Sequence, residues 1–285
     1  MDLSNLRAHA RGAWVGFRHP TGTKRRASAV EGIEVPPCPE GHAVAPPDFV
    51  GVGVMKAGTS WWYQLIVDHP EVGDVGGRPK EVHFFDRYGG VSFGDEDAAR
   101  YHRYFPRPGG TIAGEWTPRY SFDFWTAPLL ARAAPEVKCL LMLRDPVERF
   151  LSGLTQELGR GQRLSLRMLN EHFLRGLYAP QLRRLQAVIP PERLLVLQYE
   201  QCVADPVAEL ARTYEFLGVD ARHRPEHLGD TVNPTWFDRP DFDDVALADM
   251  ARAYVDEHGQ LEELCPSIDL DRWSTTISLA HHRTS

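Results

Sequence analysis

The chain has 285 residues, of which 42% are hydrophobic and 25% are charged, and its formal net charge at pH 7 is −7. A chain of this length and composition can bury a sizeable core, and it is most simply one α/β domain with an extension. The acidic balance argues against nucleic acid or a long polyanion as a partner, because both require a broad basic surface.

No apolar stretch approaches the roughly 20 residues that a membrane-spanning helix needs, and the first residues lack the apolar core of a signal peptide. The four cysteines, Cys38, Cys139, Cys202 and Cys265, are widely scattered, without the spacing of a metal site or a disulfide framework. We therefore expect a cytoplasmic protein with reduced thiols and no metal.

Residues 1–48 are a basic and proline-rich extension before the first predicted strand. Six basic residues precede Val30 against the single acid Asp2, and prolines follow between Pro36 and Pro47. The extension is either an arm without chemistry or a source of positive charge for a cleft that receives an anionic acceptor.

A phosphate site is predicted at residues 51–60, which read GVGVMKAGTS. The apolar run at 49–54 predicts a buried strand, and an amphipathic helix is predicted from Thr59. Unpaired backbone N–H groups and the positive end of the helix dipole meet where the glycine loop enters that helix, and together they attract anions. Only four of the 32 basic residues are lysines, so Lys56 indicates a site that needs a compact ammonium.

The position of the lysine argues against a nucleoside-triphosphate loop. In that loop, G-x-x-x-x-G-K-[ST], the lysine directly follows the second glycine. Gly53 and Gly58 have this separation, but Thr59 stands in the lysine position and Lys56 lies two residues before Gly58. A kinase would also need an acidic ligand for Mg²⁺, and the sequence offers no convincing one.

A second phosphate ligand is predicted in the segment 137–153, which reads VKCLLMLRDPVERFLSG. Its apolar run predicts a strand that ends at Arg144, followed by a helix with Asp145 as its cap and Pro146 at its first position. Ligands of open α/β sheets bind beyond the carboxyl ends of the strands. Arg144 and Ser152 are therefore candidates for a phosphate, although Arg144 could simply pair with Asp145 or Glu148.

Strand and helix patterns alternate along the rest of the chain. We predict strands at 49–54, 111–114, 138–143 and 194–198, and helices at 59–68, near 95–104, at 124–134, from 146, across 165–188, at 206–217 and at 243–257. This order predicts one α/β domain over 49–285, with a mostly parallel sheet and helices on both faces. A helical, arginine-rich insertion near 159–192 is a candidate wall of an acceptor cleft.

Three motifs resemble those of the sulfotransferases that use 3′-phosphoadenosine 5′-phosphosulfate (PAPS), which have a P-loop-containing fold. The sequence KAGTS at 56–60 resembles their 5′-phosphosulfate loop, and RDPVERFLS at 144–152 resembles their 3′-phosphate motif. The sequence KEVHFFD at 80–86 is similar to the segment that carries the catalytic base in the Golgi-type carbohydrate branch, especially the heparan sulfate 3-O- and N-sulfotransferases. The resemblance extends from Phe49 to Trp273.

This resemblance implies a role for each matching residue. Glu81 would be the general base, Lys56 would stabilise the transition state, and His83 would orient the acceptor, share the proton or serve only the structure. The residues expected to bind PAPS are Lys56, Ala57, Gly58, Thr59, Ser60, Trp61, Arg144, Ser152 and, in a loop over the adenosine, Arg239.

One position departs from the carbohydrate branch, which usually has a second lysine in the pattern E-K-[ST]-P. The corresponding residues 115–118 read EWTP, so Trp116 stands in the place of the lysine. Lys80 or Arg119 could supply the missing cation, or the tryptophan ring could stack on an acceptor. The departure argues against a highly sulfated glycan as the acceptor.

We therefore expect metal-free transfer of a sulfuryl group from PAPS to a hydroxyl or amine of a small or medium acceptor, such as a secondary metabolite, a glycoside or a lipid. The arginine- and alanine-rich composition suggests a high-GC bacterial source and a role in natural-product biosynthesis. Two alternatives stay open, a P-loop kinase that uses Mg-ATP and a catalytically inactive nucleotide-binding protein. The sequence does not determine the acceptor or the oligomeric state.

Overall fold

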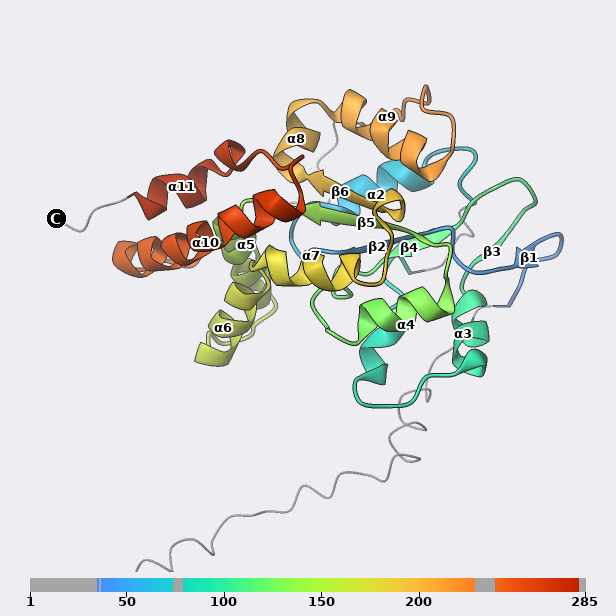
Figure 1. Cartoon of the computed structure of the whole chain (residues 1–285), viewed down its shortest axis with the longest axis horizontal. Helices are drawn as coiled ribbons and strands as arrows, with labels where there is room; N and C mark the ends of the chain where they lie inside the picture. Colours follow the sequence, from blue (N-terminus) through green and yellow to red (C-terminus); the bar gives the residue numbers. More distant parts are fainter. Residues whose placement is uncertain (1–34, 36, 74–78, 229–238, 282–285) are drawn as a thin grey trace, which may run out of the picture.

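A computed structural model of the chain describes residues 35, 37–73, 79–228 and 239–281 (Figure 1). The six basic residues before Val30 lie outside this part of the chain. Within it, a parallel sheet of four strands forms the centre of the fold, in the order β4-β2-β5-β6. Their bounds are β2 (Phe49–Gly53), β4 (Gly114–Trp116), β5 (Lys138–Leu143) and β6 (Leu194–Gln198). The predicted α/β fold class is confirmed.

Helices lie on both faces of this sheet (Figure 1). One face carries α2 (Thr59–Val67), α8 (Tyr199–Ala204) and α9 (Pro206–Leu217), and the other carries α4 (Thr126–Ala133) and α7 (Tyr178–Gln186). Beyond the β6 side of the sheet lie α5 (Pro146–Gly159), α6 (Leu166–Leu174), α10 (Asp244–Leu264) and α11 (Ser274–Ala280). The remaining elements are β1 (Ala43–Val44), α3 (Asp95–His102), β3 (Pro106–Arg107) and the 3₁₀ helices η3 (Phe85–Tyr88), η4 (Pro191–Arg193) and η5 (Leu270–Arg272).

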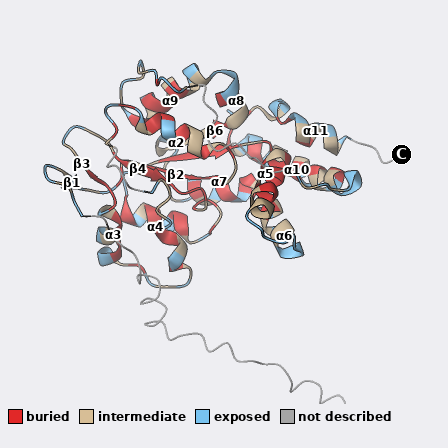
Figure 2. Ribbon diagram, turned by 180° about the vertical axis from the view of Figure 1, so that it is seen from behind, coloured by how far each residue is buried: buried red, intermediate tan, exposed pale blue. Residues whose placement is uncertain are grey.

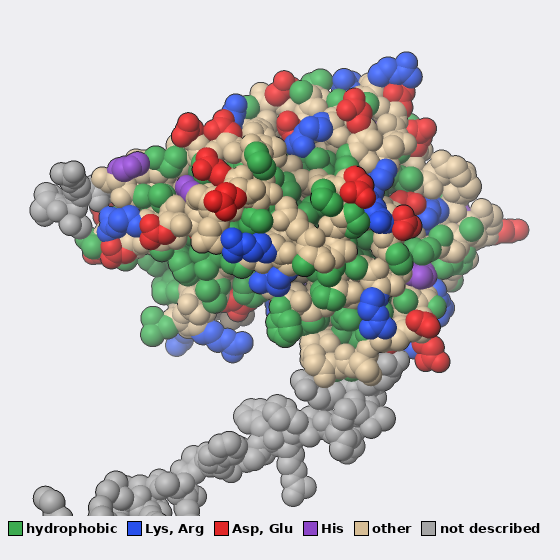
Figure 3. Space-filling view, in the orientation of Figure 1, with side chains coloured by type: hydrophobic (Ala, Val, Ile, Leu, Met, Phe, Trp, Pro, Cys, Tyr) green, Lys and Arg blue, Asp and Glu red, His purple; other side chains and the backbone are tan. Residues whose placement is uncertain are grey.

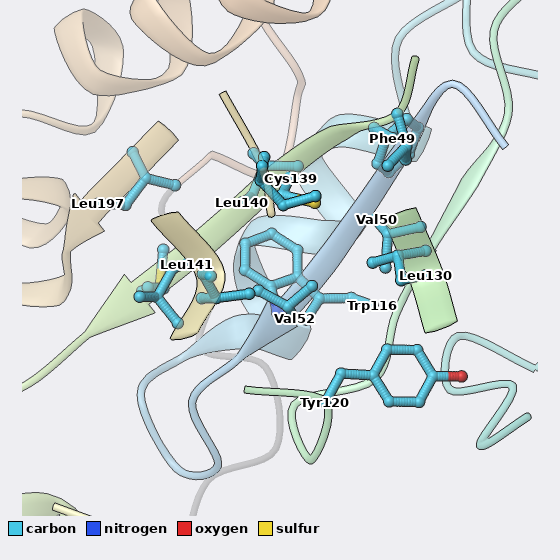
Figure 4. Packing of buried hydrophobic residues seen from close by; sticks show 14 of the residues in the cluster. Phe49, Val50, Val52, Trp116, Tyr120, Leu130, Cys139, Leu140, Leu141 and Leu197 are labelled. Carbon is cyan, nitrogen blue, oxygen red and sulfur yellow. The ribbon is translucent and has the colours of Figure 1, made fainter. Parts of the chain in front are cut away.

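The hydrophobic core follows the two central strands. All five residues of β2 are buried, as are the residues of β5 after Lys138, because a parallel strand covered on both faces has no side exposed to water. Figure 2 shows the buried residues on these strands and on the helix sides that face them. In Figure 4, Leu130 of α4 and the indole of Trp116 lie against this strand layer. A second cluster, around Val147, Leu154 and Tyr254, packs α5 against α10.

The predicted strand at 111–114 is wrong in its bounds, because β4 begins only at Gly114. The backbone N–H groups before it are bonded outside the sheet. Ile112 donates to the carbonyl of Glu71 at 2.9 Å, and Ala113 donates to the carboxylate of Asp48 at 2.8 Å. Apolar alternation alone cannot distinguish these partners from a neighbouring strand. The predicted helix at 243–257 is also too short, since α10 continues to Leu264.

Candidate active site

The two predicted phosphate motifs lie side by side in the fold. The strands β2 and β5 are parallel neighbours, so the loop after β2 and Arg144 after β5 leave the same edge of the sheet. Arg144 Nη1 donates to the carbonyl of Lys56 at 3.2 Å, which joins the two motifs directly. Topology thus brings together segments that are almost 90 residues apart in the chain.

Left-handed backbone shapes the loop at the start of α2. Lys56 has φ 68° and Gly58, which caps α2, has φ 87°. At Gly58 a side chain is excluded twice, because this φ favours glycine and because a Cβ atom would lie 2.6 Å from the ring of Tyr199. Burial lowers the pKa of Lys56, and the positive charges of Arg144 and Arg160 lower it further. Three cations around one helix N-terminus make this region attractive to an anion.

Arg144 and Arg239 converge on one carboxylate, that of Glu148. Arg239 donates to Glu148 at 3.0 and 2.6 Å, and Arg144 lies 3.4 Å from the same group. Burial raises the pKa of Glu148, but Arg239 and Arg144 outweigh burial and hold this pKa below its usual value. Arg144 therefore makes the simple pairing that the sequence left open, and its guanidinium also lies 4.9 Å over the ring of Tyr199.

The start of α5 has the predicted cap. Asp145 accepts the backbone N–H groups of Val147 and Glu148 at 3.0 and 3.1 Å, and Pro146 occupies the first helical position. Asp145 is thereby used by the helix rather than by Arg144. Ser152 is half-buried and lies one turn after Glu148, on the same face of the helix.

Glu81 lies between two hydrogen-bond donors. Its Oε1 is 3.2 Å from Lys80 Nζ, and its Oε2 is 3.1 Å from His83 Nε2. The other ring nitrogen of His83 is 2.8 Å from Asp86. His83 has φ 53°, so the segment is not regularly extended there, and the ring still reaches Glu81. Hydrogen bonds thus connect Glu81 to His83 and His83 to Asp86 in one continuous series.

The charges of these three hydrogen-bonded residues stabilise one another. Hydrogen bonds to Asp86 and Glu81 raise the pKa of His83 to about 10, so the ring is an imidazolium at neutral pH. Burial raises the pKa of Glu81, but the hydrogen bonds from His83 and Lys80 outweigh it and leave the pKa below its usual value. Glu81 is therefore ionised at neutral pH and able to accept a proton. Sequence reasoning missed Asp86, whose signal was a carboxylate three residues after a histidine.

Glu115 of β4 holds the Glu81 segment in place. It is buried, and it accepts the backbone N–H of Val82 at 3.0 Å and the hydroxyl of Tyr101 at 2.6 Å. One residue further along β4, the N–H of Trp116 donates to the carbonyl of Lys80 at 2.9 Å. The position of Glu81 relative to the sheet thus depends on β4, whose role here the sequence did not suggest.

Trp116 and the two candidates for the missing cation, Arg119 and Lys80, differ clearly in their contacts. Trp116 is fully buried, and its Nε1 donates to the carbonyl of Gly53 at 3.1 Å. The prediction that its ring stacks on an acceptor is therefore wrong, because no part of the ring is accessible. Arg119 donates to Asp123 at 2.7 Å. Lys80 instead points to the start of α2, with its Nζ 3.2 Å from Thr59 Oγ1 and 3.0 Å from Ser60 Oγ.

The predicted cleft wall near 159–192 contains α6 and α7. Arg175 is buried at its middle, bonded to Glu171 at 2.5 Å and lying 4.4 Å over the ring of Phe122. The most exposed large apolar side chains in and near this wall are Leu166 on α6, at 84%, and Phe124 before α4, at 70%. Figure 3 shows hydrophobic side chains gathered on this lower part of the molecule.

Known proteins resemble this chain in sequence. A model described as the Sulfotransferase family matches residues 97–223. Human heparan sulfate glucosamine 3-O-sulfotransferase 3B1 is 30% identical over 188 residues, which cover 61% of this chain and 46% of that protein. Mouse heparan sulfate glucosamine 3-O-sulfotransferase 6 is 32% identical over 187 residues, which cover 61% and 52%. The chain is thus similar to sulfotransferases in sequence. It spans about half the length of these curated relatives.

A solved structure confirms the sulfotransferase fold. The crystal structure of a sulfotransferase from Alicyclobacillus acidocaldarius superposes with a TM-score of 0.64 at 24% identity, covering 81% of this chain and all of that one. The match to the family model includes Arg144 and Ser152, whereas Lys56 and Glu81 precede it. The roles of the individual residues thus rest on their contacts and motifs.

In the part of the chain that the structure describes, every helix is too short or too polar to cross a bilayer. The cytoplasmic location remains a prediction.

Proposed function

We propose that this relative of the sulfotransferases transfers the sulfuryl group of PAPS to a hydroxyl or amine of a small or medium acceptor. One observation carries the proposal. The ionised Glu81 is connected through Lys80 to the hydroxyls of Thr59 and Ser60 at the start of α2. A proton acceptor thus lies beside the N-terminus at which a transferring anionic group would bind.

The donor would bind along the edge where β2 and β5 end. The backbone of 57–61 and the ammonium of Lys56 would hold the 5′-phosphosulfate, because this is where unpaired N–H groups and positive charge coincide. Arg144, Ser152 and Arg239 would hold the 3′-phosphate. Both guanidiniums bond to Glu148, so the position of its carboxylate marks a place that attracts an anion.

The reaction would be a single in-line displacement. The acceptor oxygen or nitrogen forms a bond to sulfur while the bond from sulfur to the 5′-phosphate oxygen breaks, and that oxygen keeps the electron pair. Glu81 takes the proton of the acceptor, held in position by His83 and Asp86. Lys56 stabilises the charge on the departing phosphate. The products are the sulfated acceptor and adenosine 3′,5′-bisphosphate.

The acceptor would carry little negative charge. In and beside the predicted cleft wall, Arg119 and Arg175 each have a carboxylate partner, Asp123 and Glu171 respectively. A polyanion would have to displace these partners, whereas a neutral compound would not. Exposed Phe124 adds apolar surface nearby. A secondary metabolite, a glycoside or a lipid fits this balance, and a cytoplasmic role in natural-product biosynthesis is consistent with it.

Ligand-dependent melting tests the proposal against the kinase alternative. We expect adenosine 3′,5′-bisphosphate to raise the melting temperature, because a ligand at 100 times its dissociation constant stabilises the folded state by about 2.7 kcal/mol. For a domain of this size each kcal/mol corresponds to roughly 2–4 °C. The shift should be lost in Arg144→Ala. A shift with Mg-ATP alone would instead establish the kinase.

A further inference from the structure

Lys80 links the two halves of the candidate site. Its ammonium lies 3.2 Å from Thr59 Oγ1, 3.0 Å from Ser60 Oγ and 3.2 Å from Glu81 Oε1. Its side chain is only 18% exposed, and burial lowers its pKa while Glu81 offsets part of that effect. A single ammonium therefore contacts both the first turn of α2 and the predicted base.

The backbone fixes Lys80 in this position. Its carbonyl accepts the N–H of Trp116, and the next residue but one, Val82, is bonded to Glu115. Both anchors belong to β4, which pairs with β2 directly before the phosphate loop. The lysine is thus aimed at α2 by the sheet itself, so little conformational entropy is lost when a substrate binds.

We propose that Lys80 supplies a second cation to the transferring sulfuryl group and couples its transfer to the proton uptake by Glu81. This inference rests on the proposed function. Before the reaction, the negative charge near Lys80 is on Glu81. As Glu81 takes the acceptor proton and the bond between sulfur and the 5′-phosphate oxygen breaks, that charge moves to the departing oxygen. An ammonium between the two positions stabilises the negative charge while that charge moves from one to the other. It therefore binds the transition state better than the ground state.

Trp116, Arg119 and Lys56 are less suited to this role. Trp116 is neutral and buried, and Arg119 is held by Asp123 with a second carboxylate, Asp86, 3.8 Å away. Lys56 lies close enough to Arg144 and Arg160 for their charges to lower its pKa. Lys80 is the described lysine that bonds to the predicted base.

Two substitutions distinguish the effect of the positive charge of Lys80 from the effect of its hydrogen bonds. Lys80→Gln keeps an amide that can donate to Ser60 or Glu81 but removes the charge, whereas Lys80→Arg keeps the charge. We would measure the dissociation constant of adenosine 3′,5′-bisphosphate by calorimetry and the rate at which PAPS releases that product, with water as acceptor. Lys138→Gln is the matched control, because its ammonium bonds to the carbonyl of Leu217 at the opposite end of β5.

We expect Lys80→Gln to lower kcat on the order of 10²–10³-fold at the pH of maximal rate, as for loss of other transition-state donors. The dissociation constant should change by less than about threefold, and Lys80→Arg should recover at least about tenfold of the lost rate. The acid limb of the pH profile of Lys80→Gln should move to higher pH, because Glu81 loses a positive neighbour. Lys138→Gln should behave as the wild type.

The outcomes that overturn this inference differ from those that overturn the function. Wild-type rates in a folded Lys80→Gln would show that Lys80 is only an anchor, and loss of rate in Arg119→Gln but not in Lys80→Gln would assign the cation to Arg119. If Lys80→Gln does not fold, an inactive but folded Lys80→Arg overturns it equally. A wild-type chain that does not bind the bisphosphate would contradict the proposed function, and with it this inference.

Discussion

Glu81 is the residue on which the proposed chemistry depends most directly. Its two carboxylate oxygens are bonded to different cations, Lys80 and His83, and the second of these is bonded in turn to Asp86. Such an arrangement fixes the rotamer of the base and keeps it ionised, at the cost of lowering its affinity for a proton. Within the proposed mechanism, both neighbours hold Glu81 in place and keep it ionised until it takes the proton of the acceptor.

Replacement of Glu81 by glutamine tests its role. We expect Glu81→Gln to lower the rate of PAPS turnover by about 10²–10⁴-fold, because a general base contributes that much, with the affinity for adenosine 3′,5′-bisphosphate almost unchanged. Turnover and calorimetric binding measure the two effects. Glu136→Gln, which removes an exposed carboxylate before β5, is the control. Equal rates in wild type and Glu81→Gln would support the inactive nucleotide-binding alternative.

The same contacts predict how activity depends on pH. The pKa of Glu81 lies below its usual value of 4.5, so the base stays ionised down to that range and activity falls only as it is protonated there. The pKa of His83 is raised to about 10, so the stabilisation of the folded state by its two ion pairs is complete below pH 6.5 and is lost as the pH rises through 10. Between these limits we expect activity to be nearly independent of pH, because Glu81, His83 and Asp86 keep their charges.

At the scale of elements, the contact between β2 and β4 positions the site. The ring of Trp116 lies directly on the backbone of Gly51, where a Cβ atom would be 2.0 Å from the ring. Its Nε1 also bonds to Gly53, the last residue of β2. Tryptophan in this place thus packs the sheet rather than binding a substrate, which explains how the chain accommodates it so near the loop.

An alanine at Gly51 tests this packing. We expect Gly51→Ala to lower the free energy of unfolding by about 1–3 kcal/mol, since overpacking of a closed core costs this much, and to weaken bisphosphate binding by displacing β2. Urea denaturation measures the first effect. Gly109→Ala is the control, because no atom would lie within 4 Å of its Cβ. Equal stability of the two variants would mean that the indole moves freely, contrary to its buried hydrogen bond.

In the molecule as a whole, the parallel sheet brings together segments of the candidate site that are far apart in the chain. The loop after β2, Arg144 after β5 and Tyr199 after β6 all leave one edge, and Arg239 reaches the same place from beyond α9. This edge carries lysine and arginine side chains around a helix N-terminus, and protein groups alone would neutralise the charge of the donor. A transferring sulfuryl group carries less charge than a phosphoryl group, so the proposed reaction needs no metal.

Chelation therefore discriminates between the reaction classes. We expect release of adenosine 3′,5′-bisphosphate from PAPS to be unchanged by EDTA and by added Mg²⁺, because Lys56, Lys80 and Arg144 supply the positive charge. A kinase would lose its activity in the chelator, since magnesium neutralises its nucleotide phosphates. Rates measured in both buffers decide the matter, and a rate that falls with EDTA and returns with Mg²⁺ would contradict the proposal.

The sequence by itself predicted the features that depend on residues close together along the chain. The apolar runs of β2, β5 and β6, the cap of α5 by Asp145 and the glycine loop before α2 are local patterns, and the structure has each of them. The order of strands and helices then predicted a parallel sheet, whose carboxyl edge places Arg144 beside the loop of Lys56. The fold class and the approximate place of the candidate site follow from these patterns alone.

Only the tertiary structure decided which side chains meet. Three contacts join residues that are far apart in the chain: Lys80 reaches Ser60, Trp116 is buried on Gly51, and Arg239 bonds to Glu148. No local pattern encodes such contacts, because they depend on how the strands are ordered and how far each helix is turned about its axis. The physical reason is packing: a side chain finds its partner only when the backbones that carry both are already in place.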